Sequence, residues 1–383
     1  MSSGEFVCVR CVGDPGLAAV LRKAVVPGVR CSFCGRVDAA ALEVLVAAFT
    51  EGVRRDYRDA ANGEAGATRS ADAHGTADLL AGPFAGALTG PGLSGAVVRA
   101  LGNHAWVRRD AGAVPRDVAL MSSWQSFSHI VRHRIRYVFW KRTAVADAEV
   151  LRAGEIPPAL ILREIGAIIA DLGLVRTLAP DEPLWRARVH PAGADVGSAA
   201  ALGTLPVGLS TRSNRMNPAG IPMFYAADSA DTAYQEAVGE RGAGTEMTLG
   251  AFRVSRPARI VDFTDLPPVP SPFDPQQGHL RRCVAFLHDF VADLGQEVSP
   301  RYVEIDYVPT QVVTEFLLHA WDPGQRIDGL AYRSVRTGGV CVVLDVGAED
   351  CVAPDDARLA GPEADGGRLR LVLDPETVRL AAE

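Results

Sequence analysis

An arginine, a tyrosine and a glutamate lie within a short stretch of this sequence, in an order and spacing that could form a ligand-binding site. Arg215 lies in residues 214–220, where Asn-Pro and Ala-Gly predict a turn. Tyr225 lies in the apolar run 221–226, which is typical of a short buried strand, and Glu236 follows it by eleven residues. Glu236 is expected about two turns into a helix built mostly of small apolar residues. A carboxylate on such a helix either pairs with a cation or acts on a ligand.

Two further segments place polar side chains beside expected strands. Arg186 lies in the strand predicted for residues 184–189, and a guanidinium there could hold phosphate oxygens through two parallel hydrogen bonds. Ser334 lies in residues 328–336, which lead through two glycines into the strand predicted for residues 340–344. The glycines would let the backbone approach a ligand closely. No histidine and aspartate are arranged around Ser334, so we do not interpret it as a nucleophile.

Four cysteines near the start of the sequence have the spacing of a zinc site. Cys8-x-x-Cys11 and Cys31-x-x-Cys34 are separated by 19 residues, and each pair could supply two thiolates to a tetrahedral ion. Neither pair contains a histidine or carboxylate that would suggest an open catalytic position, so we predict a closed, structural zinc site. The other three cysteines are unpaired in the sequence, and this usage fits a reducing, cytoplasmic compartment better than a disulfide framework.

The secondary structure predicted to position these residues changes along the chain, from mainly helical to mixed helix and strand. The first part is mainly helical, with an amphipathic helix predicted at residues 38–59 and further helical patterns at 93–103, 116–142 and 158–175. From about residue 178, short β-rich runs alternate with helices, which predicts an α+β domain with a sheet core. The strands are expected at residues 184–189, 247–254, 258–263, 340–344 and 369–373, and the helices at residues 229–239, 276–294 and 310–320.

Composition limits the classes of function. A hydrophobic fraction of 48% and a charged fraction of 22% are ordinary for a soluble globular protein. The net charge of −7 provides no overall basic field for nucleic acid. No apolar run approaches the roughly 20 residues that span a bilayer, and we expect neither a membrane segment nor a secretory signal. Abundant Ala, Gly and Asp, with Arg far more common than Lys, are typical of GC-rich bacterial coding.

The order of these motifs resembles the RES domain, which is named for an arginine, a glutamate and a serine. The strand with Arg186, the turn with Arg215, the strand with Tyr225, the helix with Glu236 and the serine before a strand follow this order within residues 180–347. The sequence departs from the family around Arg215, because Asn-Arg-Met-Asn replaces the usual Gly-Arg-Trp/Phe-Asn. The cysteine pairs and the helical region that follows resemble the HEPN-type region that accompanies some RES domains. We therefore expect a four-cysteine zinc segment at residues 1–36, a HEPN-like domain at 37–178 and a RES domain at 179–383.

The resemblance implies a fold like that of ADP-ribosyltransferases and NAD+ as the substrate. Cleavage of the nicotinamide–ribose bond passes through a cationic, oxocarbenium-like state, and Glu236 would supply the anion that stabilises it. Arg186 and Arg215 would hold phosphate oxygens, with Arg188 and Arg212 as close competitors.

Two more residues have implied roles. Tyr225 would stack on nicotinamide or bond a ribose, unless it is an ordinary core tyrosine. The hydroxyl of Ser334 would bond a phosphate or the nicotinamide amide.

We therefore expect a cytoplasmic bacterial toxin that consumes NAD+ and transfers ADP-ribose to phosphate or water, in a toxin–antitoxin or phage-defence setting. An Xre-like antitoxin is the expected protein partner, and the acceptor and a homo-oligomeric state are left open. One alternative is an ADP-ribosyltransferase that modifies a macromolecule. Another is a HEPN-type RNase toxin in which the C-terminal domain only binds a nucleotide. Arg99 and His104 have the nuclease spacing, although a surface arginine with an incidental histidine is the favoured interpretation.

Overall fold

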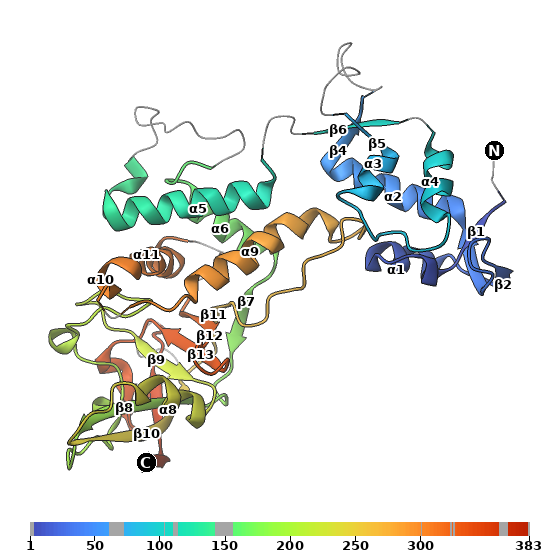
Figure 1. Ribbon diagram of the computed structural model, residues 1–383. Coiled ribbons are helices and arrows are strands. Elements are labelled where there is room, and N and C mark those ends of the chain that lie inside the picture. The colour runs from blue at the N-terminus through green and yellow to red at the C-terminus, as the bar shows by residue number, and fades with distance from the viewer. Residues whose placement is uncertain are drawn as a thin grey trace. The chain divides into compact units, whose positions relative to one another are not determined.

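A computed structural model of the chain describes residues 4–60, 73–102, 104–109, 114–141, 156–299, 301–321, 324, 326–359 and 367–381. The described chain divides into two compact units, each assembled from separate stretches of sequence (Figure 1). The first unit contains the described residues up to 119 together with 267–286. The second contains the described residues of 120–141 and 156–266 and those from 287 onward.

The first unit combines helices with two small sheets. Its helices are α1 (Pro15–Lys23), α2 (Leu42–Asp56), α3 (Thr76–Ala81) and α4 (Leu93–Leu101). One sheet has the order β1-β3-β2, formed by β1 (Phe6–Val7), β2 (Val26–Arg30) and β3 (Val37–Ala41). The other has the order β4-β6-β5, formed by β4 (Tyr57–Asp59), β5 (His74–Gly75) and β6 (Ala105–Arg108). This part of the chain is therefore helical, as predicted, but it also contains strands that the helical pattern did not predict.

The helix predicted at residues 38–59 is shorter than expected, because the residues at both of its ends form strands instead. Ala40 pairs with Val7 across β1 and β3, and Ala39 and Ala40 are fully buried. At the other end, Tyr57 pairs with Arg108 across β4 and β6. The residues between these two strands have the hydrophobic periodicity of a helix, and they form α2 as predicted.

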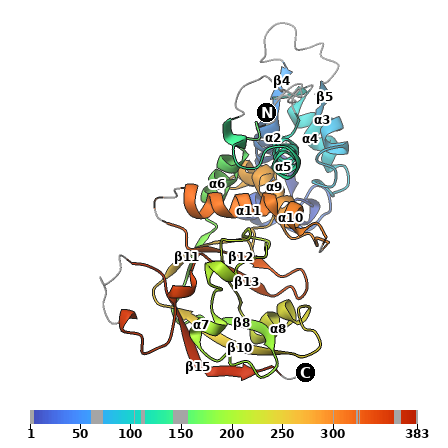
Figure 2. The same ribbon diagram turned by 90° about the vertical axis from the view of Figure 1, so that its left-hand side faces the viewer.

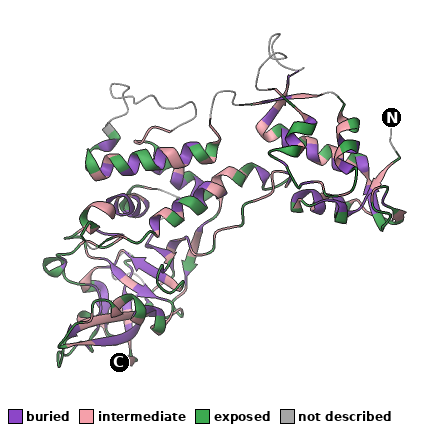
Figure 3. Cartoon of the chain, viewed as in Figure 1, coloured by how far each residue is buried: buried purple, intermediate pink, exposed green. Residues whose placement is uncertain are grey.

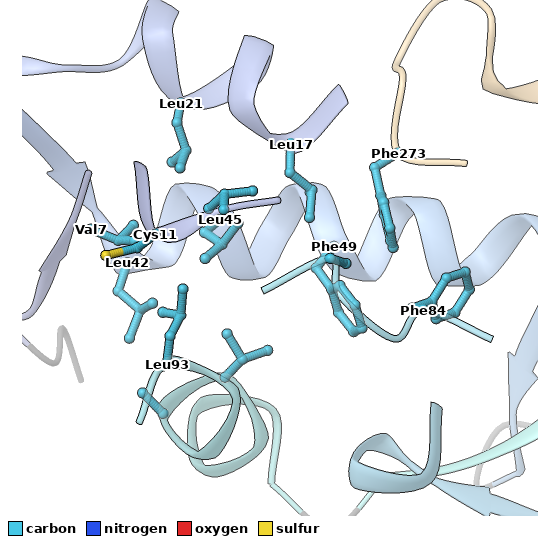
Figure 4. Close-up of a cluster of buried hydrophobic side chains, with 14 of the residues drawn as sticks. Val7, Cys11, Leu17, Leu21, Leu42, Leu45, Phe49, Phe84, Leu93 and Phe273 are labelled. Carbon is cyan, nitrogen blue, oxygen red and sulfur yellow. The ribbon is translucent and has the colours of Figure 1, made fainter. Parts of the chain in front are cut away.

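A cluster of aromatic rings closes the core of the first unit. Phe273 stacks on Phe49 of α2 with ring centroids 5.2 Å apart, and its ring lies 5.0 Å from that of Phe84 (Figure 4). A Cβ added to Gly52 would lie 2.2 Å from the ring of Phe273, so α2 needs a glycine at this contact. All three rings are buried. Residues 267–286 thus complete a core whose other members lie far earlier in the sequence.

The second unit is built on a mixed sheet of nine strands in the order β14-β15-β10-β8-β9-β13-β12-β11-β7. The strands are β7 (Val175–Leu178), β8 (Leu184–Pro191), β9 (Phe224–Ala227), β10 (Thr245–Val254), β11 (Ala258–Asp262), β12 (Gly329–Arg333), β13 (Val340–Leu344), β14 (Cys351–Val352) and β15 (Leu371–Leu380). The pairs β11–β12 and β14–β15 are parallel, and the other pairs are antiparallel. In Figure 3, β12 and β13 are largely buried, in keeping with their central place in the sheet.

Helices accompany this sheet (Figure 2). The second unit contains α6 (Ile161–Asp171), α7 (Ala199–Leu202), α8 (Ala230–Val238), α10 (Val303–Asp306) and α11 (Val308–Glu315), with most of α5 (Arg116–His133) and of α9 (Arg281–Leu294). α8 packs against β8, β9, β10 and β13. None of the described helices is long and apolar enough to cross a membrane.

The sheet opens between two of its central strands. β8 pairs with β10 at eight positions but with β9 at only one, Trp185 with Ala227. Beside that single pair, the guanidinium of Arg186 donates to the carbonyl of Tyr225 over 2.6 Å, where a continuous ladder would place a backbone N–H. The two strands therefore diverge, and side chains of both strands face the space between them.

Candidate active site and metal centre

The opening between β8 and β9 forms a cavity of about 720 Å³, within the range of about 300–1,000 Å³ that is common for small-molecule sites. Strands β8 and β9, helix α8, the loop before β9 and the turn after β12 line it. The five residues predicted from the sequence all line this one cavity: Arg186, Arg215, Tyr225, Glu236 and Ser334. They come from segments up to 148 residues apart, which the fold brings together.

Glu236 and Ser334 are in direct contact. The Oγ of Ser334 donates a hydrogen bond to Oε1 of Glu236 and accepts hydrogen bonds from the backbone N–H groups of Arg336 (3.1 Å) and Thr337 (3.0 Å). One donated and two accepted bonds use the full capacity of a hydroxyl. Ser334 is buried, and Oε2 of Glu236 has no hydrogen bond within the described residues. The serine thus fixes the carboxylate and leaves its second oxygen for a ligand.

Local packing explains this contact. Ser229 caps α8 by accepting a hydrogen bond from the N–H of Thr232 over 3.2 Å. The turn after β12 closes through a 2.8 Å bond from the N–H of Ser334 to the carbonyl of Gly339. A Cβ added to Gly339 would lie 2.2 Å from Oγ1 of Thr232, so only glycine lets the turn meet the first turn of the helix. Glu236, one turn further along α8, then reaches Ser334.

Two arginines of β8 form one wall of the cavity. Arg186 donates to the carbonyls of Leu202 (2.7 Å) and Tyr225, and Arg188 donates to the carbonyl of Gly203. Burial and the neighbouring Arg188 lower the pKa of Arg186 to about 9, and burial also lowers the pKa of Arg188. Neither guanidinium has an ion-pair partner among the described residues. Because half-buried cations without a counter-charge are costly, an anionic ligand at this wall would be stabilised.

Arg215 lies on another side of the cavity and is held in place by the protein. Its guanidinium donates to the carbonyls of Leu294 and Gln296 and lies 5.2 Å from the ring centre of Tyr307. The hydroxyl of Thr310 donates to the carbonyl of Arg215 over 2.5 Å. Residues around the start of α11 therefore position the arginine loop, in spite of its departure from the family sequence.

The hydroxyl of Tyr225 is engaged within the protein. It donates to Oδ1 of Asn217 over 2.5 Å and accepts the N–H of Met216 over 3.2 Å, and burial raises its pKa. Its aromatic ring is the part that remains available to a ligand.

The lining residues that the sequence-based set lacked include Tyr307, Tyr332 and Arg336. Period-2 alternation back from Ser334 could have indicated Tyr332, and proximity to Ser334 could have indicated Arg336. Arg212, which we considered as a competitor of Arg215, is exposed and does not line the cavity.

A second cavity of about 680 Å³ in the same unit differs in its electrostatics. Arg256 is paired with Asp328 over 2.8 Å, Arg326 with Asp345 over 2.7 Å, and Arg368 with acidic neighbours. Its cations are therefore neutralised by the protein. By contrast, the arginines at the opening of the sheet carry charge that a ligand could neutralise.

The four N-terminal cysteines converge on one point of the first unit. The sulfurs of Cys8, Cys11, Cys31 and Cys34 all lie within 4.8 Å of one another, with Cys8–Cys11 and Cys11–Cys31 at 3.8 Å. Four thiolates around a tetrahedral zinc with Zn–S bonds of about 2.3 Å would lie about 3.8 Å apart. Burial raises the pKa of Cys8 and of Cys11, whereas at Cys31 backbone N–H groups outweigh burial and lower the pKa to about 7, so the protein itself favours the thiolate at Cys31 but not at these two cysteines. The cluster therefore fits a zinc ion held by four thiolates.

The two residues with nuclease spacing occupy different settings. Arg99 lies exposed at the end of α4. Nδ1 of His104 lies 2.5 Å from Oδ2 of Asp59, and its ring stacks on Trp106 at 5.6 Å. The histidine is thus held by a carboxylate and an aromatic ring within the β4-β6-β5 sheet region.

Comparison with known families agrees with this architecture. The chain carries a RES domain, matched over residues 183–363, and enzymes with this domain generally act on NAD+. HEPN/RES N-terminal domain 1 matches residues 26–145, so the chain combines a HEPN/RES N-terminal domain with a RES domain. No curated protein and no solved structure matches the chain.

Proposed function

We propose that this protein is a toxin that consumes NAD+ by breaking the nicotinamide–ribose bond and passing ADP-ribose to phosphate or water. The observation that carries the proposal is the contact between Ser334 and Glu236 in a cavity whose walls hold unpaired arginines. A carboxylate that keeps one oxygen free, in the same cavity as fixed cations, suits a substrate that has an anionic pyrophosphate and a reacting carbon that becomes positive.

In this proposal, Glu236 stabilises the oxocarbenium-like state at the nicotinamide ribose, through a ribose hydroxyl or directly through space. Ser334 is a positioning residue, because its hydroxyl is used up in fixing the carboxylate and the turn. Arg186, Arg188 and Arg215 hold the pyrophosphate, and the ring of Tyr225 supports the nicotinamide. The bonding pair of the broken C–N bond leaves with nicotinamide, which becomes neutral, so the leaving group needs no proton.

The proposed setting is a bacterial toxin–antitoxin or phage-defence module with an Xre-like antitoxin. We also propose that the fold shares the arrangement of ADP-ribosyltransferases. The division into a four-cysteine segment at 1–36, a HEPN-like domain at 37–178 and a RES domain at 179–383 remains part of this proposal, with zinc in a structural role.

The test is Glu236→Gln, which keeps shape and hydrogen bonding but removes the anion. The rate of nicotinamide release from NAD+ should fall at least about a hundredfold. Glu240→Gln is the matched control, since it removes the same charge from another glutamate of the cavity lining, in the turn that follows α8, and it should cost less than about tenfold. Equal losses for both variants would refute the assigned role of Glu236. A labelled macromolecule as the product would replace the proposal by the transferase alternative.

A further inference from the structure

Four arginines line the cavity, and one of them differs from the others. Arg186, Arg188 and Arg215 are each tied to backbone carbonyls, as described above. The guanidinium of Arg336 has no hydrogen-bond or ion-pair partner among the described residues, although its backbone N–H donates to Ser334. Three cations are therefore fixed in the cavity wall, whereas all the donors of Arg336 remain available to a ligand.

The guanidinium of Arg336 lies against Gly239, the glycine that caps the C-terminal end of helix α8. A Cβ added to Gly239 would lie 3.0 Å from one terminal nitrogen of Arg336 and 3.5 Å from the other. The missing side chain thus makes room for the guanidinium at the C-terminal end of α8, where the helix dipole favours a cation.

Gly239 follows Glu236 by three residues, which puts both on the same face of the helix, about 5–6 Å apart. Arg336 therefore lies one helical turn from the carboxylate that we assign to the reacting carbon, and it shares a turn with Ser334. Glu240 lines the same wall without an ion pair to Arg336 among the described residues.

We propose that Arg336 binds inorganic phosphate as the acceptor and thereby selects phosphate over water. This inference rests on the proposed cleavage of NAD+. A phosphate oxygen donates an electron pair to the anomeric carbon, and the C–N bond breaks with its pair going to nicotinamide. The products are neutral nicotinamide and ADP-ribose with a new anomeric phosphate, and charge balances without a co-reactant.

The fixed arginines are less suited to this role. The pyrophosphate is present in every bound substrate molecule, so rigid guanidinium groups suit it. The acceptor enters and leaves in each turnover, and a guanidinium that makes no hydrogen bonds to the protein can bind and release it without breaking such bonds. A phosphate beside Arg336 would also compensate a charge that has no ion-pair partner among the described residues.

The experiment measures NAD+ consumption and products at varied phosphate concentration. Arg336→Gln should raise the KM for phosphate by about tenfold or more, with the KM for NAD+ within about twofold, and shift the product toward ADP-ribose. Arg336→Lys should raise the KM for phosphate less than Arg336→Gln, because a lysine keeps the positive charge but cannot form the paired hydrogen bonds of a guanidinium. Arg241→Gln is the matched control, since it removes the same charge near the end of α8 and does not line the cavity; its constants should equal those of the wild type.

Three results would overturn the inference while the proposed function stands. One is a wild type that forms only ADP-ribose at saturating phosphate. The second is an Arg336→Gln variant whose KM for phosphate does not change. The third is a variant that loses selectivity between NADP+ and NAD+, which would assign Arg336 to a phosphate on the donor. A wild type that leaves NAD+ intact would instead refute the proposed function itself.

Discussion

Replacing Ser334 by alanine tests whether this residue acts through Glu236 or directly on the substrate. The change removes the hydrogen bond to Oε1 of Glu236 and the acceptor of two backbone N–H groups. A hydrogen bond to a charged group contributes about 1.5–3 kcal/mol. Because Glu236 is exposed to the solvent of the cavity, the lower half of this range applies. With about 1.4 kcal/mol per factor of ten, kcat/KM for NAD+ should fall about 10- to 40-fold.

The effect should depend on the charge of residue 236. If Ser334 only holds the anion, Ser334→Ala should cost less than about threefold in the Glu236→Gln background, where no anion remains. If the hydroxyl binds the substrate directly, the two losses should multiply. Multiplicative losses in nicotinamide release would therefore refute the assignment of Ser334 as a positioning residue.

Folding must be followed in parallel. The N–H groups that lose their acceptor belong to the exposed residues Arg336 and Thr337, where water can replace the serine. The cost should be about 1 kcal/mol, or a decrease of about 2–4 °C in Tm. Thr337→Ala is the matched control, because it removes the acceptor of the Gly339 N–H in the same turn but no bond to Glu236. It should change Tm similarly and leave kcat/KM within about twofold.

Three further outcomes follow from the structure. Purified protein should contain about one zinc per chain, and Cys8→Ser should lose both the metal and the folded state of the four-cysteine segment; metal analysis that finds no zinc under reducing conditions would refute this. Arg99→Ala with His104→Ala should leave NAD+ consumption unchanged, and loss of toxicity in that double variant but not in Glu236→Gln would favour the nuclease alternative. Gly339→Ala should lower stability by about 1–3 kcal/mol and impair NAD+ cleavage, because its Cβ would meet Thr232; an unchanged Tm would contradict the packing described for α8.

Much of the RES domain could be predicted because its signals are local. The apolar strand of residues 340–344 and the capped helix that carries Glu236 can be read from periodicity and capping residues. The contact between Glu236 and Ser334 could not, because it depends on Gly339 meeting Thr232 across more than 100 residues. The hydrogen bond from the hydroxyl of Tyr225 to Asn217 could not be predicted either, because a sequence pattern does not show which polar groups already have hydrogen-bond partners within the protein.

The N-terminal part was less predictable for a related reason. The residues around Ala40 have a helical composition, yet they pair with a two-residue strand whose own signal is negligible. Phe273 lies among prolines in a stretch that the sequence assigns to the C-terminal domain, and only the fold reveals its place against Phe49. The hydrophobic face of a helix or strand produces a periodic pattern in the sequence, but a long-range contact made by a single residue produces no such pattern.

The aromatic core of the first unit has a consequence for the order of events during translation. Domains normally fold as they leave the ribosome, from the N-terminus onward. Here Phe49 and Phe84 emerge early, but their partner Phe273 is synthesised only after several strands of the second unit. At about 5–20 residues per second, the interval between residues 119 and 273 lasts roughly 8–30 s. During that time the nascent N-terminal unit exposes an unfinished aromatic surface, so it completes its folding only after Phe273, and therefore also the earlier Glu236, has left the ribosome.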